Sequence, residues 1–190
     1  MSELSDELYV LKDVSERLEK AHIPFMLTGS LAMNFYAQPR MTRDIDLVVQ
    51  IPAIRPSQII KYFKPDYYIS EEGVSDAVAN SSLFNLIHQA TVVKIDCIIC
   101  KRTPYRIEEF RRRQQIFVHS FQTWIATKED LILSKVGWFA DSGSERQLAD
   151  IRNLVSTGFD QAYVARWVDE LGLTESWNRA VPGRHDAGNA

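Results

Sequence analysis

A glycine turn that follows an apolar run constrains the fold of this chain more than any other feature of its sequence. The apolar run covers residues 23–27, and the turn is formed by Gly29 and Ser30. A helix-compatible segment follows at residues 31–37. Pro39 stops that segment, because proline disfavours helical backbone in the residue before it. The pattern predicts a strand, a glycine turn and a short helix in succession.

A second apolar run, at residues 45–49, carries two acidic residues near its start. Asp44 and Asp46 are two positions apart, and side chains with that spacing point to the same side of a strand. Two neighbouring carboxylates repel each other unless a cation is present. Carboxylate oxygens suit Mg²⁺, which in proteins commonly takes one or two carboxylates together with phosphate oxygens. The pair therefore predicts a magnesium site at the edge of the sheet.

The glycine turn supplies the complementary half of such a site. At the start of a helix, Gly29 and Ser30 present free backbone N–H groups, and these groups favour anions. Glycine also lets a phosphate group approach the backbone closely. A phosphate-binding turn that faces a magnesium-binding carboxylate pair is the arrangement that a nucleoside triphosphate requires.

A third acidic residue lies alone in a later apolar run. Asp96 is in the middle of residues 92–99, and residues 83–88 are predicted to form the antiparallel strand next to it. An aspartate in such a run is costly to bury unless it is paired, hydrogen-bonded or bound to a metal. Two interpretations are therefore open: an ion pair with Lys94, or a third ligand for the metal held by the first acidic pair.

The glycine turn, the acidic pair and Asp96 together resemble the signature of the DNA polymerase β-like nucleotidyltransferases. In that superfamily a Gly-Ser or Gly-Gly pair precedes Asp-apolar-Asp, and a third carboxylate follows on another strand. The stretches at residues 39–47, 127–135 and 144–151 also resemble small bacterial proteins related to AbiEii-type toxins. The resemblance implies an α/β (α+β) fold, in which helices flank a mixed sheet of about four to six strands and a helical segment follows.

The resemblance also implies roles for individual residues. Asp44, Asp46 and Asp96 are the expected catalytic residues and the expected ligands of two Mg²⁺ ions, with Mn²⁺ as a substitute. The expected nucleotide-binding residues are Gly29, Ser30, Thr42, Arg43, Lys135 and Arg146. For Lys135 an ordinary surface lysine is an open alternative. Arg146 could pair with Asp150, four residues later on the same predicted helix.

The activity that the resemblance implies is transfer of a nucleoside monophosphate from an NTP to an acceptor hydroxyl. An RNA or tRNA acceptor, and a cognate antitoxin as partner, are expected if the chain acts as a toxin. One alternative is a non-catalytic nucleotide-binding or antitoxin-like regulatory protein, because fold does not settle function. Another is an aminoglycoside-type nucleotidyltransferase, which needs an acidic cleft for its polycationic substrate.

Charge and composition restrict the possible partners. A net charge of −3 and a pI of about 5.8 argue against nucleic-acid binding through overall charge. The arginines within residues 102–113 argue mildly against an aminoglycoside substrate. They form either a phosphate-contacting surface or a solvated helix face with internal ion pairs. The acidic amino terminus lacks the apolar segment of a signal peptide, so a cytoplasmic protein without a membrane partner is expected.

The predicted organisation is a nucleotidyltransferase core at residues 1–122 and a C-terminal helical region at residues 123–181 that packs on it. Residues 182–190 contain a proline and two glycines and are predicted to form a flexible tail. The sequence gives no indication of the oligomeric state.

Overall fold

The computed structural model describes residues 4–51 and 56–182, and the chain forms two compact units. The first unit contains the described residues up to Ala32 and from Arg40 to Ala126. The second contains Met33–Pro39 and the described residues from Thr127 onward. The division predicted at residues 122 and 123 stays a prediction, and the predicted tail lies outside the described residues from residue 183 onward.

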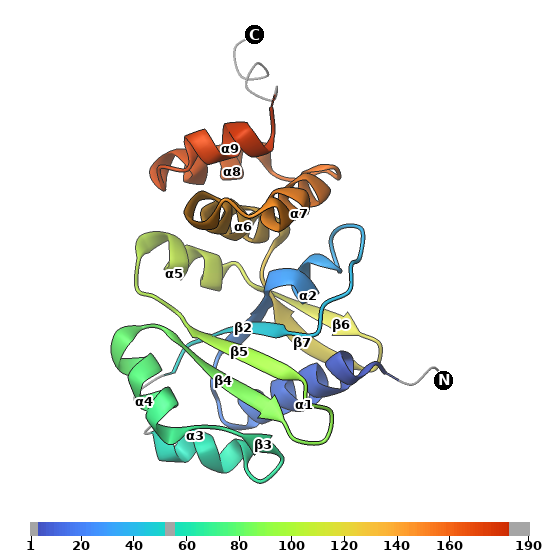
Figure 1. The fold of residues 1–190 in the computed structure, drawn as a ribbon, viewed down its shortest axis with the longest axis vertical. Coiled ribbons are helices and arrows are strands. Elements are labelled where there is room, and N and C mark those ends of the chain that lie inside the picture. Colours follow the sequence, from blue (N-terminus) through green and yellow to red (C-terminus); the bar gives the residue numbers. More distant parts are fainter. Residues whose placement is uncertain (1–3, 52–55, 183–190) are drawn as a thin grey trace. The chain divides into compact units, whose positions relative to one another are not determined.

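The first unit is built on a mixed sheet of seven strands within the described residues, ordered β3-β4-β5-β2-β1-β7-β6 (Figure 1). Strand β2 is parallel to β5 and antiparallel to β1, and β1 is parallel to β7. The expected mixed sheet with flanking helices is confirmed, with slightly more strands than expected. The strands are β1 (Phe25–Thr28), β2 (Ile45–Val49), β3 (Tyr67–Tyr68), β4 (Leu83–His88), β5 (Lys94–Ile99), β6 (Gln114–Val118) and β7 (Phe121–Ile125).

A hairpin after residue 113 supplies the additional strand. The sequence predicts one strand at residues 116–121, but β6 and β7 form an antiparallel pair there. The single-strand prediction was wrong because the turn, at His119 and Ser120, contains neither the asparagine nor the glycine that is typical of hairpins. Strand β7 lies beside β1, the strand that leads to the glycine turn.

One face of the sheet is buried under helices. Burial alternates strictly along β4 and β5, so that Phe84 and Cys97 point to the buried face and Asn85 and Asp96 to the other. Helix α1 places Leu18 against the buried face. Among the described residues, the helices of this unit are α1 (Asp6–Lys20), α3 (Pro56–Phe63), α4 (Glu71–Asn80) and α5 (Pro104–Arg111), and α2 (Gly29–Met33) begins in it.

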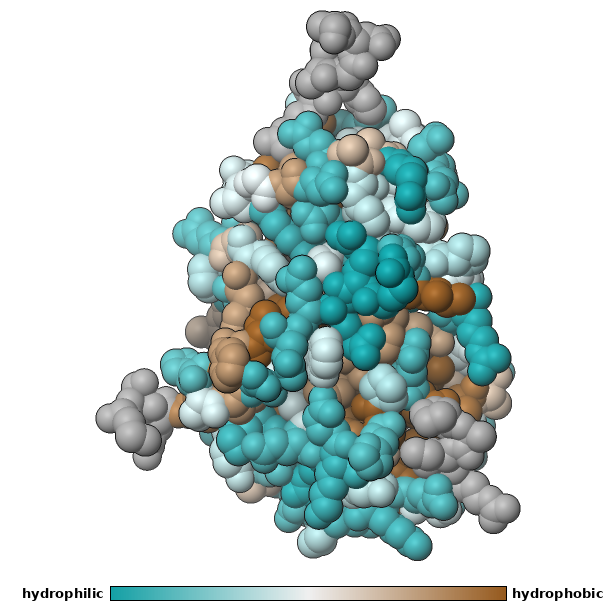
Figure 2. Space-filling view, turned by 180° about the vertical axis from the view of Figure 1, so that it is seen from behind, coloured by the Kyte–Doolittle hydropathy of each residue, from teal (hydrophilic) through white to brown (hydrophobic). Residues whose placement is uncertain are grey.

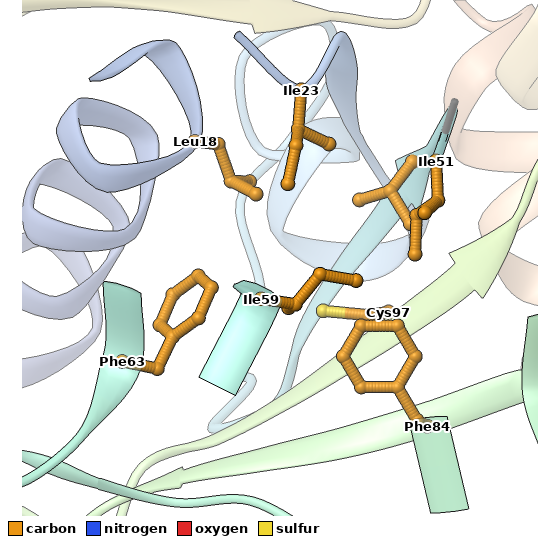
Figure 3. Close-up of a pocket in the computed structure, with 8 residues that line it drawn as sticks. Leu18, Ile23, Ile51, Ile59, Phe63, Phe84 and Cys97 are labelled. Carbon is orange, nitrogen blue, oxygen red and sulfur yellow. The ribbon is translucent and has the colours of Figure 1, made fainter. Parts of the chain in front are cut away.

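A small apolar cavity lies where α1 and α3 pack on the buried face (Figure 3). Its volume is about 10 Å³, which is at the lower limit for one water molecule, and apolar cavities of this kind stay dry. The cavity is therefore a feature of core packing and not a nucleotide site. Its lining residues are Leu18, Ile23, Val49, Ile51, Ile59, Phe63, Phe84 and Cys97.

The second unit is helical in its described residues. Helix α6 (Lys128–Ser142) contacts α7 (Glu145–Val155), α8 (Gln161–Glu170) and α9 (Thr174–Ala180). Thr127 caps α6, because its hydroxyl accepts a hydrogen bond from the N–H of Asp130. The segment from Met33 to Pro39 joins this unit through Gln38, whose backbone N–H and carbonyl both bond the Asn153 side chain.

The visible surface is mostly hydrophilic (Figure 2), as expected when apolar side chains are buried in the cores. Seen from behind, hydrophilic residues cover most of the visible face, and hydrophobic residues occur in smaller areas between them (Figure 2). Among the described residues, no helix has the length and apolar character needed to cross a membrane.

Candidate active site

Strand register brings two of the predicted acidic residues together. Asp46 on β2 is paired directly with Asp96 on β5, and neighbouring strands lie about 4.8 Å apart. The two side chains leave the same face of the sheet, opposite the helix-covered face, and both are half-buried. Asp44 is exposed and lies just before β2. Residues from three positions in the sequence thus contribute carboxylates to one end of β2.

The glycine turn lies beside this group. Thr28, the last residue of β1, is paired with Asp46, and Gly29 follows immediately. A Cβ atom on Gly29 would lie 2.0 Å from Oδ2 of Asp46 and 2.6 Å from its Cγ. Gly29 also has a φ of +66°, in the left-handed region that residues with a Cβ rarely adopt. Glycine is therefore required here both for the turn and for the close approach to the carboxylate.

Gly29→Ala is expected to cost more stability than the same change at Gly143. Both glycines have a positive φ, but Gly143 has no atom within 4 Å of an added Cβ. Both variants incur the backbone strain of about 1–2 kcal/mol. At Gly29 the added methyl group must also displace Asp46, at a further cost of about 1–3 kcal/mol. Urea unfolding of the two variants measures the difference, and equal losses would contradict the packing of Gly29 against Asp46.

Two neighbouring side chains hold Asp96. The Nζ atom of Lys94 lies 2.8 Å from Oδ1 of Asp96 and 3.0 Å from Oδ2. Asn85, the residue paired with Asp96 on β4, donates its side-chain N–H to Oδ1. The hydrogen bond to Asp96 raises the pKa of Lys94, and the charges of Asp96, Asp44 and Asp46 add to that effect. The predicted ion pair with Lys94 is confirmed, and its ammonium group lies in the field of all three carboxylates.

The donor set fits a divalent cation that is shared with a substrate. Within residues 4–51 and 56–182, no three His, Cys, Asp or Glu side chains converge closely enough to hold a metal alone. Mg²⁺ does not need such a cage, because it is commonly held by one or two carboxylates and substrate phosphates. Asp46 and Asp96 offer only oxygen atoms, lie side by side, and already have a cationic group, Lys94, close to them. These features fit Mg²⁺ or Mn²⁺.

Arg40 is a residue at the glycine turn that sequence reasoning missed. Its guanidinium donates a hydrogen bond of 2.5 Å to the hydroxyl of Ser30. The only signal for it in the sequence is its position in the loop between the turn and Asp44. Helix α2 (Gly29–Met33) is five residues long, so its dipole is small, and Arg40 supplies the positive charge at this turn. The turn thus places a guanidinium group beside Ser30, and phosphate binding here stays a prediction.

The other two predicted residues of this loop have different surroundings. Thr42 is half-buried, and its hydroxyl donates to the carbonyl of Asp44 at 3.4 Å. Arg43 is exposed. Both precede the acidic pair directly, and their roles in nucleotide binding stay predictions.

Lys135 and Arg146 belong to the second unit. The alternative of a surface lysine was wrong, because Lys135 is only 3% exposed. Its Nζ lies 2.7 Å from Oδ2 of Asp150 and 3.4 Å from Oε1 of Gln147. Asp150, the suggested partner of Arg146, thus forms a buried ion pair with Lys135, and Arg146 is exposed. Nucleotide-binding roles for these two residues stay predictions.

The arginines near α5 are largely engaged within the first unit. Arg106 pairs with Glu109 at 2.7 Å, and Arg111 pairs with Glu108 at 2.8 Å. The guanidinium carbon of Arg113 lies 4.4 Å from the centre of the Phe110 ring. These contacts favour a helix face with internal ion pairs over a phosphate-contacting surface.

Comparison with known proteins identifies the fold. No protein-family model matches the sequence, and no curated protein is significantly similar to it. A solved nucleotidyltransferase-like protein from Paracoccidioides brasiliensis is similar, with 18% identity and a TM-score of 0.56 over 90% of this chain and 92% of that one. The lincosamide antibiotic adenylyltransferase LnuA matches with 16% identity and a TM-score of 0.53, over 80% and 97% of the two chains.

The antibiotic-resistance factor ANT(2″)-Ia also matches, with 11% identity and a TM-score of 0.58 over 92% of this chain and 97% of that one. At these identities the likeness establishes the fold. The chain has the fold of nucleotidyltransferase-like proteins, as the glycine turn and the acidic residues predicted. The finer resemblance to AbiEii-type toxins stays a prediction.

Proposed function

We propose that this protein is a metal-dependent nucleotidyltransferase that moves a nucleoside monophosphate from an NTP to an acceptor hydroxyl. One observation carries the proposal: Asp46 and Asp96 are in register on adjacent parallel strands, and the backbone of Gly29 lies against Asp46. Carboxylates beside a backbone turn that admits phosphate are what a magnesium-bound triphosphate needs. The fold alone does not establish the activity.

Different residues of the site would bind the phosphates, hold the metal and accept the proton. Gly29, Ser30 and Arg40 would bind the β- and γ-phosphates. Asp44, Asp46 and Asp96 would hold the divalent ions that neutralise the triphosphate. Bound divalent ions supply charge neutralisation and lower the pKa of the acceptor hydroxyl. Asp96 accepts the proton of that hydroxyl. The acceptor oxygen then forms a bond to the α-phosphorus, the bond to the bridging oxygen breaks, and pyrophosphate leaves with that electron pair.

Two classes of acceptor are supported by different observations. The resemblance of residues 39–47, 127–135 and 144–151 to AbiEii-type toxins supports RNA or tRNA, with a cognate antitoxin as partner in the cytoplasm. The likeness to LnuA, whose solved structure holds lincomycin, supports a small-molecule acceptor. The internal pairing of the arginines near α5 weakens the objection to a cationic small molecule.

A transfer assay tests the proposal and separates the acceptors. The protein is incubated with each α-labelled NTP and Mg²⁺, and with total RNA, an aminoglycoside or a lincosamide. The expected result is label in one acceptor class and released pyrophosphate, both lost when EDTA is added. Nucleotide binding with no labelled acceptor under any condition would favour the non-catalytic binding protein.

A further inference from the structure

The ammonium group of Lys94 lies where a cation is expected at the acidic site. It contacts both oxygens of Asp96, at 2.8 and 3.0 Å. Asn85 bonds only one of these oxygens, Oδ1, from the neighbouring strand. A carboxylate whose two oxygens are engaged by an ammonium group has less capacity left to bind a metal ion. Lys94 is thus placed to compete with any divalent ion for Asp96.

The two partners of Asp96 differ in how easily they can leave. Asn85 has a short side chain on β4 and is half-buried. Lys94 has a long, flexible stem, and its side chain is 44% exposed, so its ammonium group can move to solvent or to another anion. Asn85 therefore fixes the orientation of Asp96 while Lys94 can release it.

We infer that Lys94 is an exchangeable counter-cation, which balances the carboxylates when no metal is bound and must leave Asp96 before a divalent ion can bind there. The inference rests on the proposed function. The phosphates of an arriving nucleotide give the displaced ammonium group a new anionic partner. Lys94 therefore weakens metal binding to the free protein and makes it depend on nucleotide. It is a positioning residue that acts through Asp96.

Binding of Mn²⁺ to the full chain without nucleotide, followed by electron paramagnetic resonance, tests this directly. Lys94→Met is expected to bind Mn²⁺ about tenfold more tightly than the wild type, because a competing ion pair and a nearby positive charge are both removed. Lys94→Gln should also bind Mn²⁺ more tightly than the wild type. Lys94→Arg keeps the positive charge, and its Mn²⁺ affinity is expected to stay within about twofold of that of the wild type.

Lys12→Met is a matched control. It also removes a lysine that pairs with a carboxylate, here Glu16 at 2.6 Å on α1, and it changes the net charge equally. Its Mn²⁺ affinity is expected to equal that of the wild type. A non-hydrolysable ATP analogue should tighten Mn²⁺ binding more in the wild type than in Lys94→Met, because only the wild type has an ammonium group to displace.

The outcomes separate this inference from the proposed function. Equal Mn²⁺ affinities in the wild type and Lys94→Met, with binding lost in Asp46→Asn, would overturn the role of Lys94 and leave the metal site intact. If no variant binds Mn²⁺, with or without the nucleotide analogue, both the metal site and the inference are wrong. Thermal unfolding in EDTA and in Mn²⁺ gives a second readout, since Lys94→Met should gain more stability from the ion than the wild type does.

Discussion

Asp46→Asn is expected to lower the rate of nucleotidyl transfer at least about a thousandfold, because charge stabilisation by metal at such a site contributes several kcal/mol to the barrier. The amide keeps the shape of the side chain but loses its negative charge. Asp46 lies between the glycine turn and Asp96, so no other carboxylate of the site can take the same place. The folded protein should melt at the same temperature or higher, because repulsion among the acidic residues is relieved.

Two further variants make this prediction specific. Asp44→Asn should also abolish transfer, because Asp44 is the second member of the predicted pair. Asp76→Asn removes one negative charge from an exposed position on α4 and should leave transfer unchanged. The assay follows label transfer to the acceptor and pyrophosphate release, and melting curves are recorded on the same samples. Wild-type activity in Asp46→Asn would eliminate the metal-dependent mechanism, and a large fall in melting temperature would show that Asp46 is mainly structural.

Lys135→Met is expected to reduce the free energy of unfolding by about 3–5 kcal/mol, the usual cost of breaking a buried ion pair by removing one partner. Lys135 and Asp150 are each only 3% exposed, so the substitution removes the ammonium group that pairs with a buried carboxylate. The Gln147 side chain, 3.4 Å from the same ammonium group, would lose a partner as well. The main expected effect of Lys135→Met is therefore a loss of stability and not a loss of catalysis.

Urea unfolding of three variants decides the role of Lys135. The double variant Lys135→Met with Asp150→Leu should recover most of the loss, because buried ion pairs can often be replaced by apolar side chains. Lys12→Met breaks a more exposed pair and should cost less than about 1 kcal/mol. Wild-type stability in Lys135→Met combined with weaker NTP binding would instead support the predicted contact with the triphosphate.

The local parts of the site could be predicted from the sequence because they depend on short-range patterns. Gly29 ends an apolar run, Asp46 lies in a second, and Asp96 interrupts a third. The first pattern indicates a strand that ends at a turn, and the other two indicate strands with a carboxylate on one face. What joins Asp46 to Asp96 is a parallel pairing between β2 and β5. Parallel pairing links segments that are distant in the chain, so only the resemblance to nucleotidyltransferases could predict it.

Side-chain partners were harder to predict than strands. Arg40 bonds Ser30 across a loop, and Lys135 pairs with Asp150 from the next helix. The partner of Arg40 depends on the path of the loop, and the partner of Lys135 depends on which faces of α6 and α7 are turned toward each other. Hydrophobic periodicity determines neither for charged residues. The suggestion that Arg146 pairs with Asp150 rested on a four-residue spacing within one helix, and it did not account for a buried cation on a neighbouring helix.

The path of the chain limits how this protein can be dissected. The backbone passes between the two units at residues 32–33, 39–40 and 126–127. A fragment that ends at Ala126 would retain Asp44, Asp46 and Asp96 but lose Asn153. The Asn153 side chain accepts a hydrogen bond from the N–H of Gln38 and donates one to its carbonyl. The loop that connects the glycine turn to the acidic pair would then lose these two hydrogen bonds near its midpoint. Proteolytic removal of the helical unit is therefore expected to disturb the loop before Asp44 even though no acidic residue of the predicted site is deleted.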